Sequence, residues 1–298
     1  MDQPTARLAH FSDLHLTVPR FGWRREDWFN KRLAAWLNLR VFGRGWRFRH
    51  ADPVLRALAR ELRQRRPGHL VFSGDASAMG FGEEAGRVAE ILDVASWPGL
   101  AVPGNHDYCT RTAWREGCFE QAFAPWQEGR RIDGHRYPFA QRVGGAWLVG
   151  VNSSTANRWP WDATGRVGEE QLERLARLLA ELDDGPRVLV THYPVVRSNG
   201  RPERLLRRLR DLDALLAVAA AGRVKLWLHG HRHEAYRFPA GAVAPFPVIC
   251  AGSATQTGRW AYGEYEVAAG KVAGRVRRYD PRAKAFKDGE AFELAMPG

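Results

Sequence analysis

Cysteine is scarce in this sequence of 298 residues, which contains three: Cys109, Cys118 and Cys250. They lack the paired spacing of a metal-binding motif, and their odd number favours a reducing compartment over a disulfide framework. A bridge between Cys109 and Cys118 stays open as an alternative. Long apolar runs are also missing, because the longest, Ala214 to Ala221, is far below the roughly 20 residues that cross a bilayer and indicates a buried helix.

The start of the sequence lacks the basic and apolar leader of a secreted protein, since Met1-Asp2-Gln3-Pro4 runs almost directly into the first expected strand. No internal repeat or Gly/Ser-rich linker divides the chain. A composition of 45% hydrophobic and 26% charged residues supports a substantial core. We expect one large domain over residues 1–298, or two intimate ones, in a protein that is cytoplasmic or bound to the membrane from that side.

Polar clusters follow five apolar, strand-like runs. They are Asp13-Leu14-His15, Gly74-Asp75, Gly104-Asn105-His106-Asp107, Thr191-His192 and Gly230-His231-Arg232-His233. In an open α/β sheet the loops beyond the carboxyl ends of the strands converge on one crevice. Residues two apart, such as Asp13 and His15, can point the same way from extended chain. The glycines before the clusters permit sharp exits from the strands.

The chemistry of these clusters is that of a site for two divalent cations. Such a site needs carboxylate and amide oxygens and neutral imidazoles, with one carboxylate able to bridge both ions. Mixed ligands of this kind suit Mn²⁺, Fe²⁺, Zn²⁺ or Co²⁺. The clusters together therefore indicate a hydrolase.

The order of the clusters resembles that of the calcineurin-like metallophosphoesterases, whose pattern reads D-x-H, GD, GNHD, a lone H and GHxH, here between Arg7 and His233. The resemblance implies a four-layer α/β/β/α sandwich of two mixed sheets. It implies that one metal is bound by Asp13, His15, Asp75 and His233, and the other by Asp75, Asn105, His192 and His231. It favours Mn²⁺ and makes Asp75 the bridge. A bridging hydroxide would then attack phosphorus in line with the leaving oxygen.

His106 is the catalytic residue that the resemblance implies, as the group that stabilises the transition state and protonates the leaving group. Some relatives orient this histidine with an acidic residue three positions after the bridging aspartate, where this chain has Ala78. Asp107 is the candidate orienting group, and a neighbouring loop is the alternative. The histidines outside the pattern are expected to be structural or surface residues: His10, His50, His69 and His135.

Between the clusters, periodicity predicts three helices and two hairpins. The helices run from Asp52-Pro53 toward Arg66, from Glu169 onward, and from about Pro202 to Ala221. One hairpin spans Tyr137 to Asn152 and turns at Gly144-Gly145, and the other spans Trp260 to Tyr279.

Positive charge is concentrated in an insertion at residues 17–50. The whole chain has 45 basic and 33 acidic residues, and this segment holds nine basic against two acidic residues together with four tryptophans. Phe29, Leu33, Trp36, Leu37 and Val41 would share one face of a helix that Asp27 could cap. The insertion is a lid, a membrane contact or a packed surface element. The candidate substrate or membrane contacts are Arg24, Arg25, Lys31, Arg32, Trp36, Asn38 and, from a second basic run, Arg197.

The insertion also bears a weaker resemblance to the bacterial UDP-2,3-diacylglucosamine pyrophosphatases of lipid A synthesis, through Lys31-Arg32 and Leu37-Asn38. It implies an anionic, lipid-linked nucleotide substrate met at the cytoplasmic membrane face. The alternative is a soluble cyclic-nucleotide or general phosphodiesterase. A nuclease is disfavoured and no nucleic-acid partner is expected, because no nucleic-acid module follows the clusters. A non-catalytic scaffold is disfavoured because every residue of the metal pattern is present.

Overall fold

Two mixed β-sheets pack face to face in the computed structural model, which describes residues 5–297. The first sheet has the order β13-β12-β11-β1-β2-β3. Its strands are β1 (Ala6–Phe11), β2 (His69–Phe72), β3 (Gly99–Ala101), β11 (Ala261–Ala268), β12 (Lys271–Asp280) and β13 (Ala285–Ala295). Strands β1, β2 and β3 are parallel, and β11 pairs antiparallel with β1.

The second sheet has the order β4-β5-β6-β7-β8-β10-β9. Its strands are β4 (Arg130–Arg131), β5 (Phe139–Val143), β6 (Ala146–Gly150), β7 (Arg187–Val190), β8 (Val224–His229), β9 (Ala235–Phe238) and β10 (Val248–Ala251). Strands β6, β7, β8 and β10 run parallel to one another. Five of the parallel strands, β1, β2, β3, β7 and β8, precede the polar clusters, so the clusters emerge at carboxyl ends of strands.

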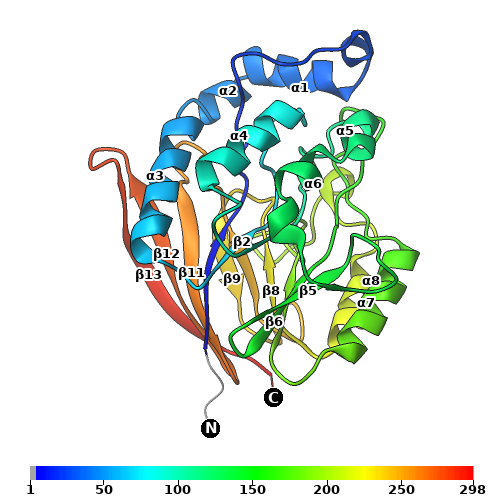
Figure 1. Cartoon of the computed structure of the whole chain (residues 1–298), viewed down its shortest axis with the longest axis vertical. Coiled ribbons are helices and arrows are strands. Elements are labelled where there is room, and N and C mark those ends of the chain that lie inside the picture. The colour runs from blue at the N-terminus through cyan, green and yellow to red at the C-terminus, as the bar shows by residue number, and fades with distance from the viewer. Residues whose placement is uncertain (1–4, 298) are drawn as a thin grey trace.

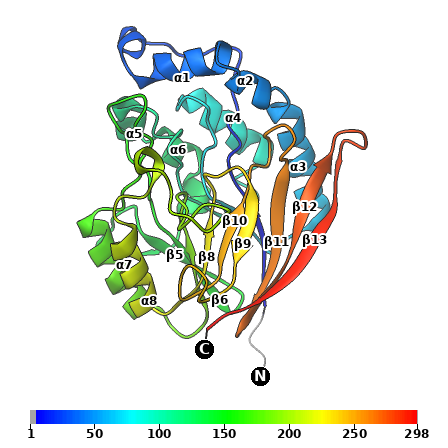
Figure 2. The same cartoon turned by 180° about the vertical axis from the view of Figure 1, so that it is seen from behind.

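Helices cover the outer faces of both sheets (Figures 1 and 2). One outer layer contains α3 (Ala51–Arg65), α4 (Gly82–Leu92), α6 (Cys118–Ala122) and η2 (Ala124–Gln127), and the other contains α7 (Glu169–Glu181) and α8 (Leu212–Ala221). The short helices α5 (Arg111–Glu116) and η3 (Leu205–Arg207) lie in connecting segments. Three apolar cores separate the layers, one between the sheets and one under each set of helices. The predicted α/β/β/α sandwich is confirmed.

Most predicted elements occur where the patterns place them. Both hairpins are present, and the helix predicted from Asp52-Pro53 is α3. The start of the third helix is wrong: α8 begins at Leu212, and Pro202 to Asp211 is mainly irregular chain with the short η3. Residues Gly165 and Leu209 form a β-bridge there, so the backbone of this basic stretch bonds to a neighbouring loop instead of to a helix.

The insertion folds into η1 (Arg25–Phe29), α1 (Lys31–Arg40) and α2 (Arg44–Arg47). Helix α1 lies across the end of the molecule opposite to the two termini (Figure 1). Asp27 does not cap this helix, which is a correction: Asn30 is the cap and accepts from the backbone of Arg32, while Asp27 is buried in an ion pair with the Arg32 side chain.

Helix α1 buries little of the apolar face predicted for it. Its buried residues are Arg32 and Leu39, whereas Val41 is 65% exposed and Phe29 is 91% exposed. Arg32 is buried because its guanidinium donates to the carbonyl oxygens of Met79 and Gly80, so a charged residue replaces an apolar one as the anchor. Within residues 5–297, none of the helices combines the length and apolarity that a membrane crossing needs.

Candidate metal centre

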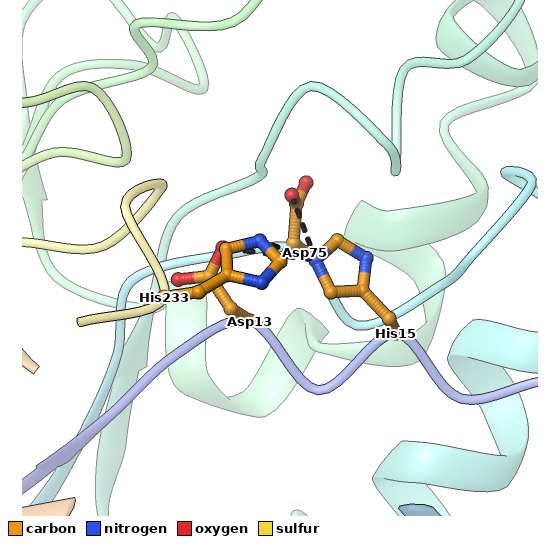
Figure 3. A group of neighbouring side chains, drawn as sticks. All are labelled: Asp13, His15, Asp75 and His233. Atoms are coloured by element: carbon orange, nitrogen blue, oxygen red, sulfur yellow. Dashed lines mark hydrogen bonds and ion pairs between the residues drawn. The ribbon is translucent and has the colours of Figure 1, made fainter. Parts of the chain in front are cut away.

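The loop after β1, the loop after β2 and the loop after β8 bring Asp13, His15, Asp75 and His233 together (Figure 3). Potential ligand atoms of all four lie within 4.8 Å of one another. The Nε2 atoms of His15 and His233 are 3.1 Å apart. Asp13 Oδ1 is 3.2 Å from His233 Nε2. Each residue thus offers one atom to a common point, as a metal ligand must.

Asn105, His192 and His231 form a second group on the other side of Asp75. Asn105 Oδ1 lies 3.2 Å from His192 Nε2 and 3.0 Å from His231 Nδ1. Asp75 Oδ2 lies 3.4 Å from His192 Nε2 and 3.5 Å from His15 Nε2 in the first group. The carboxylate of Asp75 therefore stands between two sets of donor atoms that have the chemistry of a dinuclear site.

The backbone at five of these residues is in the left-handed region. Asp13, His15 and Asp75 have φ values of 54°, 43° and 62°, and His231 and His233 have 70° and 56°. The expectation that residues two apart converge from extended chain is therefore wrong, although the residues do converge. Positive φ is uncommon outside glycine and costs about 1 to 3 kcal/mol per residue, and such strain gathers at functional sites.

Three glycines allow the loops to approach closely. A Cβ on Gly104 would lie 2.1 Å from Asp75 Oδ1, and one on Gly230 would lie 1.9 Å from Ser12 Oγ. Gly74 combines a φ of +96° with a backbone neighbour, Gly104 N, at 2.5 Å from its missing Cβ. These glycines were predicted to permit sharp exits from the strands. Their main effect is that no side-chain atoms stand where the loops are in close contact.

The orientation of the potential ligand atoms makes both groups suitable for cations. Asp13 Oδ1 is buried and accepts no hydrogen bond from any described residue. His233 and His192 each use Nδ1 for a bond to an oxygen, on Gln256 and on the Ser73 carbonyl respectively, which leaves Nε2 with a lone pair. These atoms have the identity and the proximity that a divalent cation requires.

The electrostatics of the site also favour binding of cations. Burial and then the Arg44 guanidinium lower the pKa of His15 to about 4, so its imidazole is neutral, as a ligand must be. Burial opposes protonation of His192, but the Asp75 carboxylate outweighs it and raises the pKa of His192 to about 9. Despite burial, the neighbouring histidines hold the pKa of Asp75 far below its usual value. Asp75 therefore demands positive charge beside it, which a metal ion supplies better than a proton.

His106 is oriented by a backbone group. Its Nδ1 donates to the carbonyl oxygen of Ala78 over 2.8 Å, which leaves Nε2 free. Burial and then Arg44 lower the pKa of His106 well below its usual value, so the ring is neutral near pH 7. Asp107 as the orienting group is a correction: its carboxylate accepts from the backbone of Asp75 and Ser77 and from Gly104. Asp107 thus holds the loops and not the ring.

The loops carrying these residues open into a pocket with cationic walls. Its lining includes Lys31, Asn38, Arg44, Trp161, Arg207 and Arg232 together with Asp75, Asn105, His106, His231 and His233. Lys31 and Asn38 were predicted contacts, whereas Arg44, Arg207 and Trp161 were not, and Arg232 lies in a predicted cluster without having been assigned a role. Such a surface attracts anions through charge and through the multiple donors of arginine.

The other predicted contacts lie elsewhere. Arg32 is buried in the ion pair with Asp27, and Trp36 packs against the small cluster around Met79 and Phe81. Arg24 pairs with Glu116 at the surface. Arg25 is exposed, Arg197 donates to the Pro202 carbonyl, and neither belongs to the lining of this pocket. Arg32 and Trp36 thus have structural roles, whereas for the exposed Arg24 and Arg25 a membrane contact stays a prediction.

The other predicted histidines and the cysteines belong to neither of the two groups of potential metal ligands. His10 and His69 are buried with hydrogen bonds to Ser73 and Gln141, and His50 and His135 are exposed. All three cysteines are free thiols, which settles the open question of a bridge. Cys109 lines the pocket, and burial raises the pKa of its thiol to about 11.

Comparison with known sequences agrees with this geometry. The sequence profile of the calcineurin-like phosphoesterases matches residues 6–235. A protein of Synechococcus sp. described as a probable cyclic nucleotide phosphodiesterase is 27% identical over 235 residues, which are 79% of this chain and 76% of that protein. Residues 6–235, which the profile matches, contain every polar cluster described above.

Solved structures share the fold. A dimetal phosphatase from Danio rerio superposes with a TM-score of 0.66 at 14% identity, covering 99% of this chain and 100% of that one. Purple acid phosphatase from yellow lupin (Lupinus luteus) seeds superposes with a TM-score of 0.61, also at 14% identity, over 98% of this chain and 54% of the lupin chain. The chain thus spans about half the length of the lupin protein. At these identities the likeness is one of fold.

Proposed function

Because the chain belongs to the calcineurin-like phosphoesterases and is a metal-dependent phosphoester hydrolase, we propose that its polar clusters hold two divalent cations and act on a phosphodiester or pyrophosphate bond. One cation is assigned to Asp13, His15, Asp75 and His233, and the other to Asp75, Asn105, His192 and His231. The observation that carries the assignment is the position of Asp75 Oδ2, within 3.5 Å of imidazole nitrogens from both groups.

The residues of this chain divide the work of hydrolysis. When bound, divalent cations polarise phosphoryl oxygens and acidify water. The cationic walls of the pocket bind the substrate anion and oppose its charge. His106 presents Nε2 to the reacting group, because Ala78 occupies Nδ1. Burial and Arg44 lower the pKa of this ring. A phosphate anion in the pocket would oppose that lowering, and the ring could then take up a proton and pass it to the leaving oxygen.

We propose Mn²⁺ as the native metal, with Fe²⁺, Zn²⁺ and Co²⁺ as alternatives. Two carboxylates, one amide oxygen and four imidazoles form a mixed oxygen and nitrogen ligand set that all four ions accept. The metals are identified by elemental analysis of protein purified without added metal, followed by reconstitution with each ion. Restoration of the highest kcat/KM by an ion other than Mn²⁺ contradicts this choice.

We propose that the substrate is amphiphilic, with UDP-2,3-diacylglucosamine as the leading candidate, and that the enzyme meets it at a membrane surface. The support is a set of exposed apolar side chains on the segments that line the pocket, which we call the apolar rim. The apolar rim consists of Trp28, Phe29, Leu37, Val41, Phe42, Trp46, Trp159, Trp161, Leu205 and Leu206. Phe29, Phe42 and Trp46 are 91%, 74% and 73% exposed.

The segments of the apolar rim are connected to one another. Lys31 Nζ donates to the carbonyl of Asp162, which joins α1 to the loop of Trp159 and Trp161. The backbone of Ala163 donates to Leu206, which joins that loop to η3. Arg49 and Arg158 lie over the rings of Trp46 and Trp159. Aromatic rings beside cations at the mouth of an anion-binding pocket are suited to the interface of an anionic membrane.

The substrate is tested by comparing UDP-2,3-diacylglucosamine, cyclic nucleotides and a chromogenic diester at equal concentration with the metal-loaded enzyme. We expect hydrolysis of the lipid nucleotide with the highest kcat/KM. Sedimentation with vesicles containing anionic lipid should retain the protein, and vesicles of neutral lipid should retain less. A Phe42→Ser, Trp46→Ser variant should lose vesicle binding while its hydrolysis of the soluble chromogenic diester is unchanged.

The second candidate function is hydrolysis of cyclic nucleotides in solution. It is favoured by the 27% identity to the protein described as a probable cyclic nucleotide phosphodiesterase. In that case the cyclic nucleotide has the highest kcat/KM, the protein stays in the supernatant with either vesicle, and the rim variant has unaltered activity on every substrate. Those three results together reject the amphiphilic substrate.

A further inference from the structure

We propose that Arg44 binds the phosphoryl group that is hydrolysed, so that the insertion supplies a catalytic residue to the metal site as well as covering it. This inference rests on the proposed hydrolytic role of the site around Asp75. It assigns to residues 17–50 a chemical function that is independent of which alcohol or phosphate leaves.

The side chain of Arg44 extends from α2 into the pocket. Its guanidinium lines the same cavity as Asp75, Asn105 and His106. The Nη2 atom lies 3.2 Å from Nδ1 and 3.3 Å from Nε2 of His15. Two nearly equal distances place Nη2 beside the ring between its nitrogens, which is not the geometry of a directed hydrogen bond. Arg44 therefore reaches the reacting centre, and its N–H groups there stay available to a ligand.

The charge of Arg44 also lacks a directly bound counterion. Its Nε is buried and meets no acceptor among residues 5–297. The two arginines that are most deeply buried among the described residues are paired: Arg32 with Asp27 at 2.8 Å, and Arg277 with Glu61. For Arg44 the carboxylates of Asp75 and Asp13 act only from a longer range. A buried cation without a partner is costly, so a ligand that brings negative charge is favoured at this place.

Metal binding makes this need stronger. Two divalent ions carry four positive charges, and Asp13 and Asp75 carry two negative charges, so the loaded centre is already positive before Arg44 is counted. The carboxylates that attract Arg44 would then be occupied by metals. An anionic phosphoryl group restores the balance, and a guanidinium offers it several N–H donors in a planar array.

Helix α2 is built to hold Arg44 in place. Gly43 precedes the helix with a φ of 81°, and a Cβ on Gly45 would lie 2.5 Å from the carbonyl oxygen of Leu39. The carbonyl of Arg47 accepts from the backbone of Thr257 at 2.7 Å, which attaches α2 to the loop after β10. The ring of Phe48 lies 4.7 Å from that of His15 and supports both side chains. A preorganised donor of this kind lowers the barrier without reorganising during the reaction.

The test compares Arg44→Ala and Arg44→Lys with the wild type and with Arg40→Ala, an exposed arginine of the same insertion. Metal content, thermal unfolding, binding of inorganic phosphate by calorimetry, and hydrolysis of the chromogenic diester are measured for each. We expect Arg44→Ala to keep both metals, to bind phosphate at least tenfold more weakly, and to lower kcat by about 10² to 10³-fold. Arg44→Lys should recover part of both losses, and Arg40→Ala should match the wild type.

A purely positioning role has a different signature. If Arg44 only supports His15, Arg44→Ala loses metal, and excess metal restores phosphate binding and kcat to wild-type values, which overturns the proposal. Unchanged phosphate affinity in a metal-loaded Arg44→Ala variant overturns it as well. If the wild type itself hydrolyses no ester, the proposed function fails, and the phosphate affinities of the wild type and Arg44→Ala still decide whether Arg44 is an anion-binding residue.

Discussion

At the scale of single residues, the carbonyl oxygen of Ala78 decides which nitrogen of His106 faces the pocket. A carbonyl only accepts, so Nδ1 must carry a proton and Nε2 must exchange protons with the substrate. A carboxylate at this position would accept the same hydrogen bond but add a negative charge and raise the pKa of the ring. With Ala78 the ring is easily deprotonated, which makes protonation of the leaving group the step most sensitive to His106.

We therefore expect the effect of His106→Ala to depend on the leaving group. For an alkyl ester, whose leaving oxygen needs a proton, kcat should fall by about 10² to 10⁴-fold. For a nitrophenyl ester, whose leaving group departs as an anion, the loss should be at least tenfold smaller. The measurement is kcat for both esters with metal-saturated protein. Equal losses would show that His106 acts only by binding the phosphoryl group.

Gln256 holds the proposed metal ligand His233 in place. Its Oε1 bonds to Nδ1 of His233, and its backbone is fixed by Ser253 Oγ at 2.9 Å. Loss of such a partner typically lowers metal affinity by about 10 to 100-fold. We expect Gln256→Ala to show this loss in a metal titration, with full activity at saturating metal. Gln256→Glu, which retains the acceptor, is the matched control and should bind at least as tightly as the wild type.

The clusters could be located from the sequence because each consists of several side chains with related chemistry at a short, fixed spacing. Arg44, Gln256 and Ala78 could not be located in this way. Arg44 is one of nine basic residues in the insertion, and only the turn through Gly43 and Gly45 distinguishes it. Gln256 reaches His233 only through the tertiary fold. The Ala78 carbonyl is a backbone group, which every residue has, so its role cannot be recognised from the residue type.

At the scale of elements, Glu84 joins the start of α4 to the loop that follows Asp75. Its Oε2 accepts from the backbone of Met79 at 2.9 Å and of Phe81 at 3.2 Å. Burial is the main cause that raises the pKa of Glu84 to about 8, with Asp107 adding to it and Arg32 opposing it. The folded protein therefore holds a proton here at pH values where the unfolded chain has released it.

The consequence is a loss of stability with rising pH. Between the usual pKa near 4.5 and the folded value of about 8, this group lowers the free energy of unfolding by up to about 1.4 kcal/mol per pH unit. Glu84→Gln removes the titration and keeps the acceptor. The free energy of unfolding is measured with urea at pH 5.5 and pH 8. Relative to the wild type, the free energy of unfolding of the variant should be higher at pH 8 than at pH 5.5. A constant difference between the two proteins would mean that Glu84 ionises freely in the folded state.

Elements were predicted well where periodicity and burial agree, and poorly in the insertion. In α7 the leucines that the pattern placed inside, such as Leu175 and Leu179, are fully buried. In α1 the pattern indicates an apolar face, but the buried side chain that holds the helix is Arg32, through its hydrogen bonds and ion pair. Periodicity measures apolar burial, so it does not predict a helix that is anchored by charge.

At the scale of the whole molecule, the candidate centre joins the two sheets. Asp13, Asp75 and Asn105 follow strands of the first sheet, and His192 and His231 follow strands of the second. Cations bound between them stabilise only the folded arrangement, because the ligands are dispersed in the unfolded chain. Metal binding should therefore be visible in global stability and not only in activity.

We expect chelation to lower the midpoint of thermal unfolding by several degrees, and added metal to restore it. Each site that is occupied at 100 times its Kd adds about 2.7 kcal/mol to the free energy of unfolding. Calorimetry with and without chelator measures the shift. The Asp75→Asn variant, which lacks the bridging charge, should show a much smaller shift. An equal shift in that variant would indicate metal binding outside the centre.

The pairing of β1 with β11 has a consequence for synthesis on the ribosome. Strand β1 is made first, but its neighbour on one side, β11, begins at Ala261. Until β11 has emerged, the β1 edge that carries the loop of Asp13 and His15 has no strand beside it. An open edge of this kind is a place where nascent chains associate wrongly. Closure of the first sheet therefore follows synthesis of all the proposed metal ligands, because β11 comes after His233 in the sequence.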